Sequence, residues 1–385
     1  MPSTTVCAAW RKRRASNRPM RWLSRTIKSC GRSSNASGNS KRISLNGIST
    51  WSCLRQRCGS SARRCRCSSS VPQEAPLAIA HAGALLRAGV SRKMCAKRKN
   101  MMGQTPQQVI DGQRQDWNRV AGGWEKWDRF FDEQMAFLNH RLVADARLRA
   151  GMHTLDLGSG TGYPALLGAQ TVGPSGSMTG LDLAEQMLAV ARRKATALKL
   201  ANVTFRTGDV TALPFETASF DAVTSRFCLM FLPDIPKAAA EIARVLKPGG
   251  WIAAAVWSAP DKNPSIGLSM EAIRKVVELP PPDPTAPGIF RLAQPGDLAG
   301  MLQQAGLADV TDQEFFAEWS YASAEEYYTS LMEIAAPVQN LMAKLLDTQK
   351  QEVKRLITQA ATQYRRGNCI TFPIAVRMVA ARKPL

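Results

Sequence analysis

Residues 151–258 predict a doubly wound α/β fold with a mostly parallel sheet, because three observations in the sequence agree. Short apolar runs alternate with amphipathic stretches of helical period. The stretch LDLGSGTG, Leu155 to Gly162, places a glycine-rich loop directly after the first apolar run. Each predicted strand is followed by a predicted helix or loop of crossover length, and repeated units of this kind give parallel strands with helices on both faces.

The elements follow in a regular order along this segment. We expect strands at the apolar runs HTLDLG, MTGLDL, VTFRTGD, FDAVTSRF and WIAAAVW. We expect helices at PALLGAQTV, AEQMLAVARRKATALKL and PKAAAEIARVL. Pro164 suits the first turn of the first helix, where its missing N–H is not needed. The turn KPGG, Lys247 to Gly250, joins the last helix to the last strand.

The flanking segments predict helical and mixed structure. Between 105 and 150, large apolar side chains recur at helical spacing, which predicts a helical cap over 101–150. After Trp257 we expect a proline-rich loop, a helix at PGDLAGMLQQAGL, a strand at VTDQEFFAEWSY, helix over 324–366 and a closing strand at ITFPIAVRMVAAR. Two late strands without a crossover predict an antiparallel edge strand. We assign 259–385 to substrate-pocket insertions and closing strands of the same domain.

Residues 1–100 differ in composition from the rest of the chain. They hold 22 of the 51 Lys and Arg residues but only Glu74 of the 30 acidic residues, so 101–385 carries 29 of each and is formally neutral. Their lack of apolar period predicts a disordered basic extension. Three interpretations stay open: a segment foreign to the natural protein, favoured by the abrupt change at Met101 and Met102, a mitochondrial transit peptide, or a nucleic-acid-binding arm.

The predicted location and binding partners of the protein depend on four sequence signals that we looked for. The sequence has no apolar run of about 18 residues, which a transmembrane helix needs, and PLAIAHAGALL lies too far from the N-terminus for a secretory signal. We expect a cytoplasmic protein, or a mitochondrial one if 1–100 is a transit peptide. The early cysteines lack the paired spacing of a zinc site, so no metal is predicted. The neutral charge of 101–385 predicts no nucleic-acid binding by the folded part.

The glycine-rich loop is the first candidate for a ligand site. In open α/β sheets, ligands bind outside the carboxyl ends of the strands. Gly158, Gly160 and Gly162 have the spacing GxGxG, unlike the GxGxxG of dinucleotide-binding loops. A loop so poor in side chains lets its backbone N–H groups approach a bound molecule closely.

Two acidic residues extend this candidate site. Asp182 ends the second predicted strand, where a partly exposed carboxylate can accept hydrogen bonds from both hydroxyls of a ribose. Asp209 is expected to end the third strand, with its side chain near an adenine amino group and the Val210 amide near a ring nitrogen. Leu183 and Met187, one helical turn apart, either wall the adenine or pack the helix core.

With these motifs together, residues 117–258 resemble the class I S-adenosylmethionine-dependent methyltransferases, which have a Rossmann-like fold. The segments LDLGSGTG, GLDLAEQML, ALPFETASFDAV and RVLKPGG, in this order, are similar to the ubiquinone/menaquinone-type C-methyltransferase branch. The resemblance implies S-adenosyl-L-methionine as the cofactor. It assigns the ribose to Asp182, the adenine to Asp209 and Val210, and the methionine part to the loop residues Asp156, Gly158, Ser159, Gly160, Thr161 and Gly162.

The segment after the fourth strand departs from that branch. Where those enzymes tend to have Ser-Phe-Gly-Leu, this chain has Arg226, Phe227, Cys228 and Leu229. We expect Arg226, at the matched position, to contact the cofactor or the substrate with a larger, charged side chain.

The resemblance implies in-line methyl transfer from a sulfonium to a small, largely apolar acceptor, which is quinone-like, lipid-like or another metabolite. Such a step needs alignment and exclusion of water more than a catalytic triad. Trp124 and Trp127 either face the sulfonium, an attraction of about 0.5–2 kcal/mol, or only pack their helix. Tyr163 and Cys228 lie near the expected pocket, but the sequence gives no residue the role of catalytic base.

Two other classes of function remain open. An NAD(P)-dependent oxidoreductase shares the sheet and the ribose-binding acid, although the glycine spacing fits it less well. A nucleic-acid-binding protein would depend on the basic N-terminal segment alone. The sequence sets neither the acceptor atom, whether carbon, oxygen or nitrogen, nor the oligomeric state.

Overall fold

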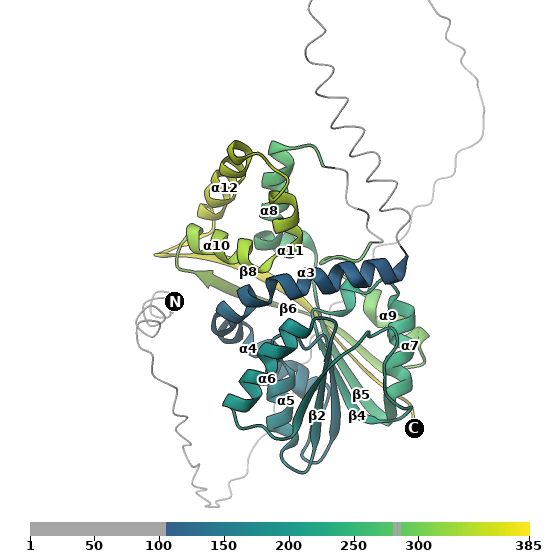
Figure 1. Ribbon diagram of the computed structural model, residues 1–385. Coiled ribbons are helices and arrows are strands. Elements are labelled where there is room, and N and C mark those ends of the chain that lie inside the picture. The colour runs from purple at the N-terminus through teal and green to yellow at the C-terminus, as the bar shows by residue number, and fades with distance from the viewer. Residues whose placement is uncertain (1–104, 280–282, 284–285) are drawn as a thin grey trace, which may run out of the picture. The chain divides into compact units, whose positions relative to one another are not determined.

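The computed structural model describes residues 105–279, 283 and 286–385, and these belong to one compact unit (Figure 1). The predictions made for residues 1–100 lie outside the described residues. The described residues form a single contact unit. The predicted boundaries of the cap, core and insertion segments at 150 and 258 stay predictions.

A mixed β-sheet forms the centre of this unit. The strand order is β3-β2-β1-β4-β5-β8-β6, with the short β7 paired to β8. The strands are β1 His153–Leu157, β2 Ser177–Asp182, β3 Val203–Thr207, β4 Phe220–Arg226, β5 Leu246–Trp257, β6 Ala308–Tyr321, β7 Arg365–Arg366 and β8 Cys369–Arg382. Strands β1 to β5 pair in parallel, and β8 is antiparallel to both β5 and β6. The predicted fold class is therefore confirmed. The strand order reverses beside β1, where a crevice is expected between β1 and β4.

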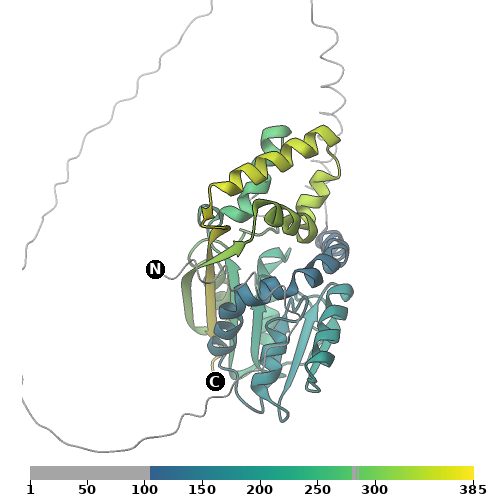
Figure 2. The same cartoon turned by 90° about the vertical axis from the view of Figure 1, so that its left-hand side faces the viewer.

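Helices cover both faces of the sheet (Figures 1 and 2). They are α3 Pro106–Lys126, α4 Asp128–Asp145, α5 Ala165–Val172, α6 Glu185–Ala197, α7 Ile235–Val245, α8 Pro264–Val276, α9 Asp297–Gln304, α10 Ala324–Ile334, α11 Ala336–Met342 and α12 Asp347–Thr362. Helix α5 connects β1 to β2 and α6 connects β2 to β3, so the sheet grows toward β3 through them. Helix α7 connects β4 to β5, so the sheet grows in the opposite direction. Because such crossovers are right-handed, α7 lies on the face opposite α5 and α6. None of the helices in the described ranges has the length and apolar character that crossing a bilayer requires.

The antiparallel strands extend beyond the parallel part of the sheet. Strand β8 pairs with β5 only as far as the Trp257 and Val376 partners, whereas its pairing with β6 continues to Tyr321 and Ile370. Helices α8, α10 and α12 pack on one another and on this extension (Figure 1). These three helices lie in the segment 259–385, for which a role in the substrate pocket stays a prediction.

Some element boundaries differ from the predictions. The helical stretch before the sheet divides at Trp127, which ends α3 and precedes α4. The stretch 324–366 divides into three helices, and the second begins with Pro337 in its first turn, because a proline cannot continue the preceding helix. KPGG lies within β5 as an irregularity in its pairing with β4. Helix α8, which likewise starts at a proline, Pro264, was not predicted, because we expected a loop after Trp257.

Candidate cofactor and substrate site

The glycine-rich loop follows β1 at the carboxyl edge of the sheet, and its three glycines all have positive φ angles. A Cβ at Gly158 would lie 2.4 Å from the Cβ of Cys228, and a Cβ at Gly162 would lie 2.8 Å from a methyl group of Leu166. A Cβ at Gly160 would have no atom within 4 Å. Packing therefore requires glycine at 158 and 162, whereas Gly160 borders the open space in which a ligand can approach.

The loop uses most of its backbone donors internally. The N–H groups of Gly158 and Ser159 both donate to the carbonyl of Leu181, at 2.8 and 3.0 Å. The Gly160 N–H donates to the Asp182 carboxylate at 2.9 Å, and the Gly162 N–H donates to the Ser159 carbonyl. Contrary to our expectation from the glycine content, these four N–H groups are not directed at a ligand. The loop offers a ligand mainly a surface without side chains.

Asp182 ends β2 and connects two parts of the site. One of its carboxylate oxygens accepts the Gly160 N–H, and the other accepts the Ala184 N–H at 2.9 Å. Burial raises the pKa of Asp182, and the backbone donors oppose this rise. Each oxygen retains lone-pair capacity for a further donor, as a ribose would require. The two backbone contacts give Asp182 a structural role beside its predicted role in binding.

Asp156 and Ser159 lie beneath the loop, at 0% and 1% exposure. The Asp156 carboxylate accepts hydrogen bonds from the Thr224 hydroxyl at 2.7 Å and from the Ser159 hydroxyl at 2.8 Å. Burial raises the pKa of Asp156 to about 6, although both hydroxyl donors oppose the rise. These two predicted cofactor-binding residues therefore support the loop from below, and direct contact of either with a ligand stays a prediction.

Replacing Asp156 with Asn should change how stability depends on pH. The folded-state pKa of about 6 lies above the ordinary value of 3.8, so the folded protein binds this proton more tightly than the unfolded chain does. The free energy of unfolding therefore falls as the pH rises from 3.8 to about 6. Asp156→Asn removes this contribution, and urea denaturation at several pH values across the interval measures the difference. An unchanged fall in the variant would contradict the assignment.

A polar cluster at the start of α4 holds the far end of the loop. The Thr161 hydroxyl donates to Asp128 at 3.2 Å, and the Lys194 ammonium pairs with the same carboxylate at 2.6 Å. Lys194 also lies over the ring of Tyr163, 4.1 Å from its centroid, and Tyr163 hydrogen-bonds to Asp132. Asp128, Asp132 and Lys194 were not predicted as site residues, because single charged residues on helices are usually solvated in water.

Of the four residues predicted to bind adenine, Met187 packs in the core and the other three lie near the carboxyl ends of β2 and β3. Asp209 lies two residues beyond the end of β3, and its carboxylate accepts the N–H and the hydroxyl of Thr211, so it does not end the strand as predicted. Val210 and Met187 are buried, whereas Leu183 is half-buried. Met187 packs with Val120, Ala121, Ala184 and Ala336 beneath Trp117 and Trp124. Core packing therefore accounts for Met187, and Leu183 is the residue left to contact a base.

The two candidate tryptophans differ in their surroundings. Trp127 is 4% exposed, and its indole N–H donates to Glu333 at 2.5 Å, so packing accounts for it. Among the described residues, the indole N–H of Trp124 is buried without a hydrogen-bond partner. Since Trp124 packs beside Met187 and α6, this donor lies close to the predicted nucleoside site.

A row of contacting aromatic rings lies in and beside the hydrophobic core, and we call it the aromatic belt. Phe227 stacks on Trp257 at 4.3 Å between ring centroids, and Trp257 contacts Trp319 at 5.6 Å. Phe131 then links Trp319, at 6.0 Å, to Trp124, at 5.0 Å. The belt combines residues of α3, α4, β5, β6 and the segment after β4. Phe131, Trp257 and Trp319 are 4%, 5% and 7% exposed and belong to the buried core. Trp124 and Phe227 are half-buried, so their rings are the members of the belt that a ligand can reach.

Neither His153 nor Cys228 is placed to act as a catalytic base. His153 begins β1, and its ring nitrogen contacts the Ser177 hydroxyl at 2.8 Å, on the edge of the sheet away from the loop. Cys228 lies beside Gly158, and burial, together with the Asp182 and Asp156 carboxylates, raises the pKa of its thiol. The thiol therefore stays protonated at neutral pH, and the catalytic base remains unassigned.

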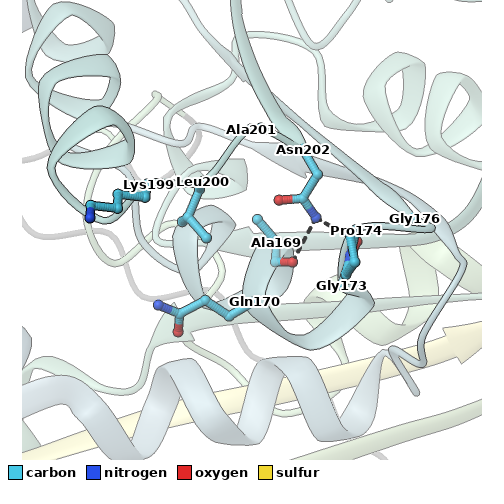
Figure 3. Close-up of a pocket in the computed structure, with 9 residues that line it drawn as sticks. All are labelled: Ala169, Gln170, Gly173, Pro174, Gly176, Lys199, Leu200, Ala201 and Asn202. Atoms are coloured by element: carbon cyan, nitrogen blue, oxygen red, sulfur yellow. Dashed lines mark hydrogen bonds between the residues drawn. The ribbon is translucent and has the colours of Figure 1, made fainter.

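A hollow of about 560 Å³ lies at the opposite edge of the sheet (Figure 3). It is lined by Ala169, Gln170, Gly173, Pro174, Gly176, Lys199, Leu200, Ala201 and Asn202. The Asn202 amide donates to the carbonyls of Ala169 and Gly173 within it. These residues precede β2 and β3, so the hollow is separate from the crevice at the carboxyl ends.

Comparison with known proteins identifies the class. Residues 155–254 match the family described as a methyltransferase domain. The demethylmenaquinone methyltransferase of Symbiobacterium thermophilum is 40% identical over 131 residues, which are 34% of this chain and 48% of that protein. The corresponding protein of Staphylococcus aureus (strain JH9) is 39% identical over 140 residues, 35% of this chain and 57% of that protein. The chain thus spans about half the length of the curated relatives it matches.

Two solved structures are also similar to the chain. The YcgJ protein of Bacillus subtilis has 21% identity and a TM-score of 0.45, covering 65% of this chain and 99% of that chain. Phosphoethanolamine N-methyltransferase 2 of Haemonchus contortus, in complex with S-adenosyl-L-methionine, has 21% identity and a TM-score of 0.41, covering 65% and 53%.

Residues 155–254 thus match the methyltransferase-domain family, and they lie on the mostly parallel sheet that the motifs predicted. This segment is also similar to the demethylmenaquinone methyltransferases, so the resemblance that its motifs carry is confirmed.

Proposed function

We propose that the protein transfers a methyl group from S-adenosyl-L-methionine to a small, largely apolar acceptor by in-line displacement. The observation that carries this proposal is the joint geometry of Gly160 and Asp182. Gly160 offers an open surface, and Asp182 lies beside it with lone pairs available for the two ribose hydroxyls. This arrangement suits a nucleoside whose other end extends along the loop.

The same loop argues against the alternative of an NAD(P)-dependent oxidoreductase. A dinucleotide site needs free N–H groups in the loop and at the helix N-terminus to hold a pyrophosphate. Here the N–H groups of Gly158, Ser159, Gly160 and Gly162 have partners within the protein, and Pro164, just before α5, has no N–H. A ligand without phosphate fits this loop better.

The residues have separate tasks in the proposed reaction. When bound, S-adenosyl-L-methionine supplies an activated methyl group on a sulfonium. Asp182 holds the ribose, whereas Leu183, Asp209 and Val210 border the base. The half-buried rings of the belt, Trp124 and Phe227, exclude water from the path of the methyl group and present faces that attract a cation.

The half-buried ring of Phe227, which stacks on Trp257, also supports an apolar acceptor, because planar or aliphatic groups pack well against rings. The names of the relatives, demethylmenaquinone methyltransferases, agree with a quinone-like acceptor, and lipid-like or other small metabolites remain compatible. We place the reaction in the cytoplasm, with a small-molecule substrate and no nucleic acid at the folded part, whose formal charge is neutral.

Transfer of label from methyl-labelled S-adenosyl-L-methionine tests this proposal. The protein is incubated with a panel of quinols, phenols and lipids, followed by extraction into organic solvent. We expect labelled product with at least one apolar acceptor and none in samples without protein. Absence of labelled product throughout, together with oxidation of NADH in parallel samples, would favour the oxidoreductase instead.

A further inference from the structure

Arg226 is the last residue of β4 and lies on the candidate site. It is two residues beyond Thr224, so both side chains project from the same face of the strand, the face on which Thr224 contacts Asp156. The Nη1 of Arg226 donates to the side-chain oxygen of Asn139 in α4 at 2.7 Å. Asn139 is only 2% exposed, so a buried partner holds the guanidinium between α4 and the carboxyl ends of β1 and β4.

The charge of Arg226 has acidic surroundings but no ion pair. The carboxylates of Asp156, Asp132 and Asp128 all act on it electrostatically. Lys194 takes Asp128 as its partner at 2.6 Å. Within the part of the chain that the structure describes, no carboxylate lies close enough to Arg226 for an ion pair, and its one hydrogen bond goes to a neutral amide. The guanidinium is half-buried and touches no carboxylate, so it keeps donors for a bidentate partner that the described residues do not supply.

The remaining donors of Arg226 keep some exposure, because the residue is half-buried. Among the described residues, the buried side-chain polar atoms without a partner are those of Trp124 and Ser330, and none belongs to Arg226. Since only Nη1 has a hydrogen bond, Nε and Nη2 remain accessible to an incoming group. These two nitrogens are adjacent in a planar fork, which matches the two oxygens of a carboxylate.

We propose that Arg226 is a carboxylate-binding residue of this site, with Asn139 as the residue that orients it. The inference rests on the proposed function, and it adds a chemical requirement that the ligand carries a carboxylate. Two sources have this chemistry: the α-carboxylate at the methionine end of the cofactor, or a carboxylate on the methyl acceptor. Either group would form a bidentate pair with Nε and Nη2.

Calorimetric titration with two ligands distinguishes the first source. S-adenosylhomocysteine has the amino-acid end, whereas 5′-methylthioadenosine lacks it. If Arg226 binds the cofactor carboxylate, Arg226→Gln should weaken S-adenosylhomocysteine binding by at least about tenfold and leave 5′-methylthioadenosine binding unchanged. Purely structural damage would weaken both ligands alike and would overturn the inference. Arg141→Gln, which removes an ion pair with Asp145 on the same helix, is the matched control and should change neither affinity.

A second variant keeps Arg226 but gives its guanidinium a carboxylate partner within the protein. Asn139→Asp places a carboxylate against Nη1 and gives the guanidinium an internal counter-ion. We expect the preference for S-adenosylhomocysteine over 5′-methylthioadenosine to fall in this variant too. A preserved preference in both variants would exclude the cofactor as the source.

The second source is tested by titrating benzoate, an aromatic carboxylate, into protein saturated with S-adenosylhomocysteine. If the acceptor carries the carboxylate, the wild type should bind benzoate and Arg226→Gln should not. Variants that match the wild type with all three ligands would overturn the inference. Failure of the proposed function is distinguishable, because the wild type itself would then bind neither nucleoside.

Discussion

Gly160→Val should abolish cofactor binding while the protein remains folded. The residue has φ of 50°, and its missing Cβ faces open space where the ligand is expected. A branched side chain there both occupies that space and resists a left-handed backbone. We expect the affinity for S-adenosylhomocysteine to fall at least about a hundredfold, or about 2.7 kcal/mol, in calorimetric titration.

A matched glycine separates these two effects. Gly367 has φ of 58° and no atom within 4 Å of a built Cβ, but it lies in the turn between β7 and β8. Gly367→Val should lower the melting temperature about as much as Gly160→Val and leave the affinity unchanged. Normal binding by Gly160→Val would show that this loop does not contact the cofactor.

Asp182→Ala should reduce both cofactor affinity and stability. The ribose loses an acceptor whose charge-assisted hydrogen bonds are worth about 1.5–3 kcal/mol each, so binding should weaken at least about tenfold. The N–H groups of Gly160 and Ala184 lose their partners at the same time, so the melting temperature without ligand should also fall. Calorimetry and thermal denaturation measure the two effects.

Asp234→Ala is the control for the structural part of this change. Its carboxylate accepts the backbone N–H of Lys237 at the start of α7, a capping contact that typically contributes about 1 kcal/mol. We expect this variant to lose stability and keep its cofactor affinity. If Asp182→Ala behaved in the same way, Asp182 would be a capping residue only, and the ribose assignment would fall.

The fold was predictable where its signals are local. Apolar runs of strand length alternate with amphipathic helices, and this pattern correctly gave β1 to β5 and α5 to α7. The boundaries set by proline were harder, because Pro264 and Pro337 start helices where we expected a loop and a continuous helix. The extension of β6 and β8 beyond β5 depends on pairing register, which the sequence of one strand does not state.

The site was predictable as a set of positions but not as a set of contacts. Motif spacing located Gly160 and Asp182 beside each other, and the structure joins them through a hydrogen bond. Spacing gave no sign that Gly158 packs on Cys228, or that Arg226 reaches Asn139, a residue 87 positions away. Such contacts arise from how α4 and the segment after β4 pack on the sheet, which local sequence does not encode.

Calorimetric titration of the unmodified protein, with S-adenosylhomocysteine and with NADH in separate experiments, tests the central claim most directly. The open surface at Gly160, the acceptor at Asp182 and the loop donors already used within the protein fit the proposed nucleoside without pyrophosphate. We expect saturable binding of S-adenosylhomocysteine and no measurable binding of NADH. Binding of NADH by a protein that ignores S-adenosylhomocysteine would contradict the account.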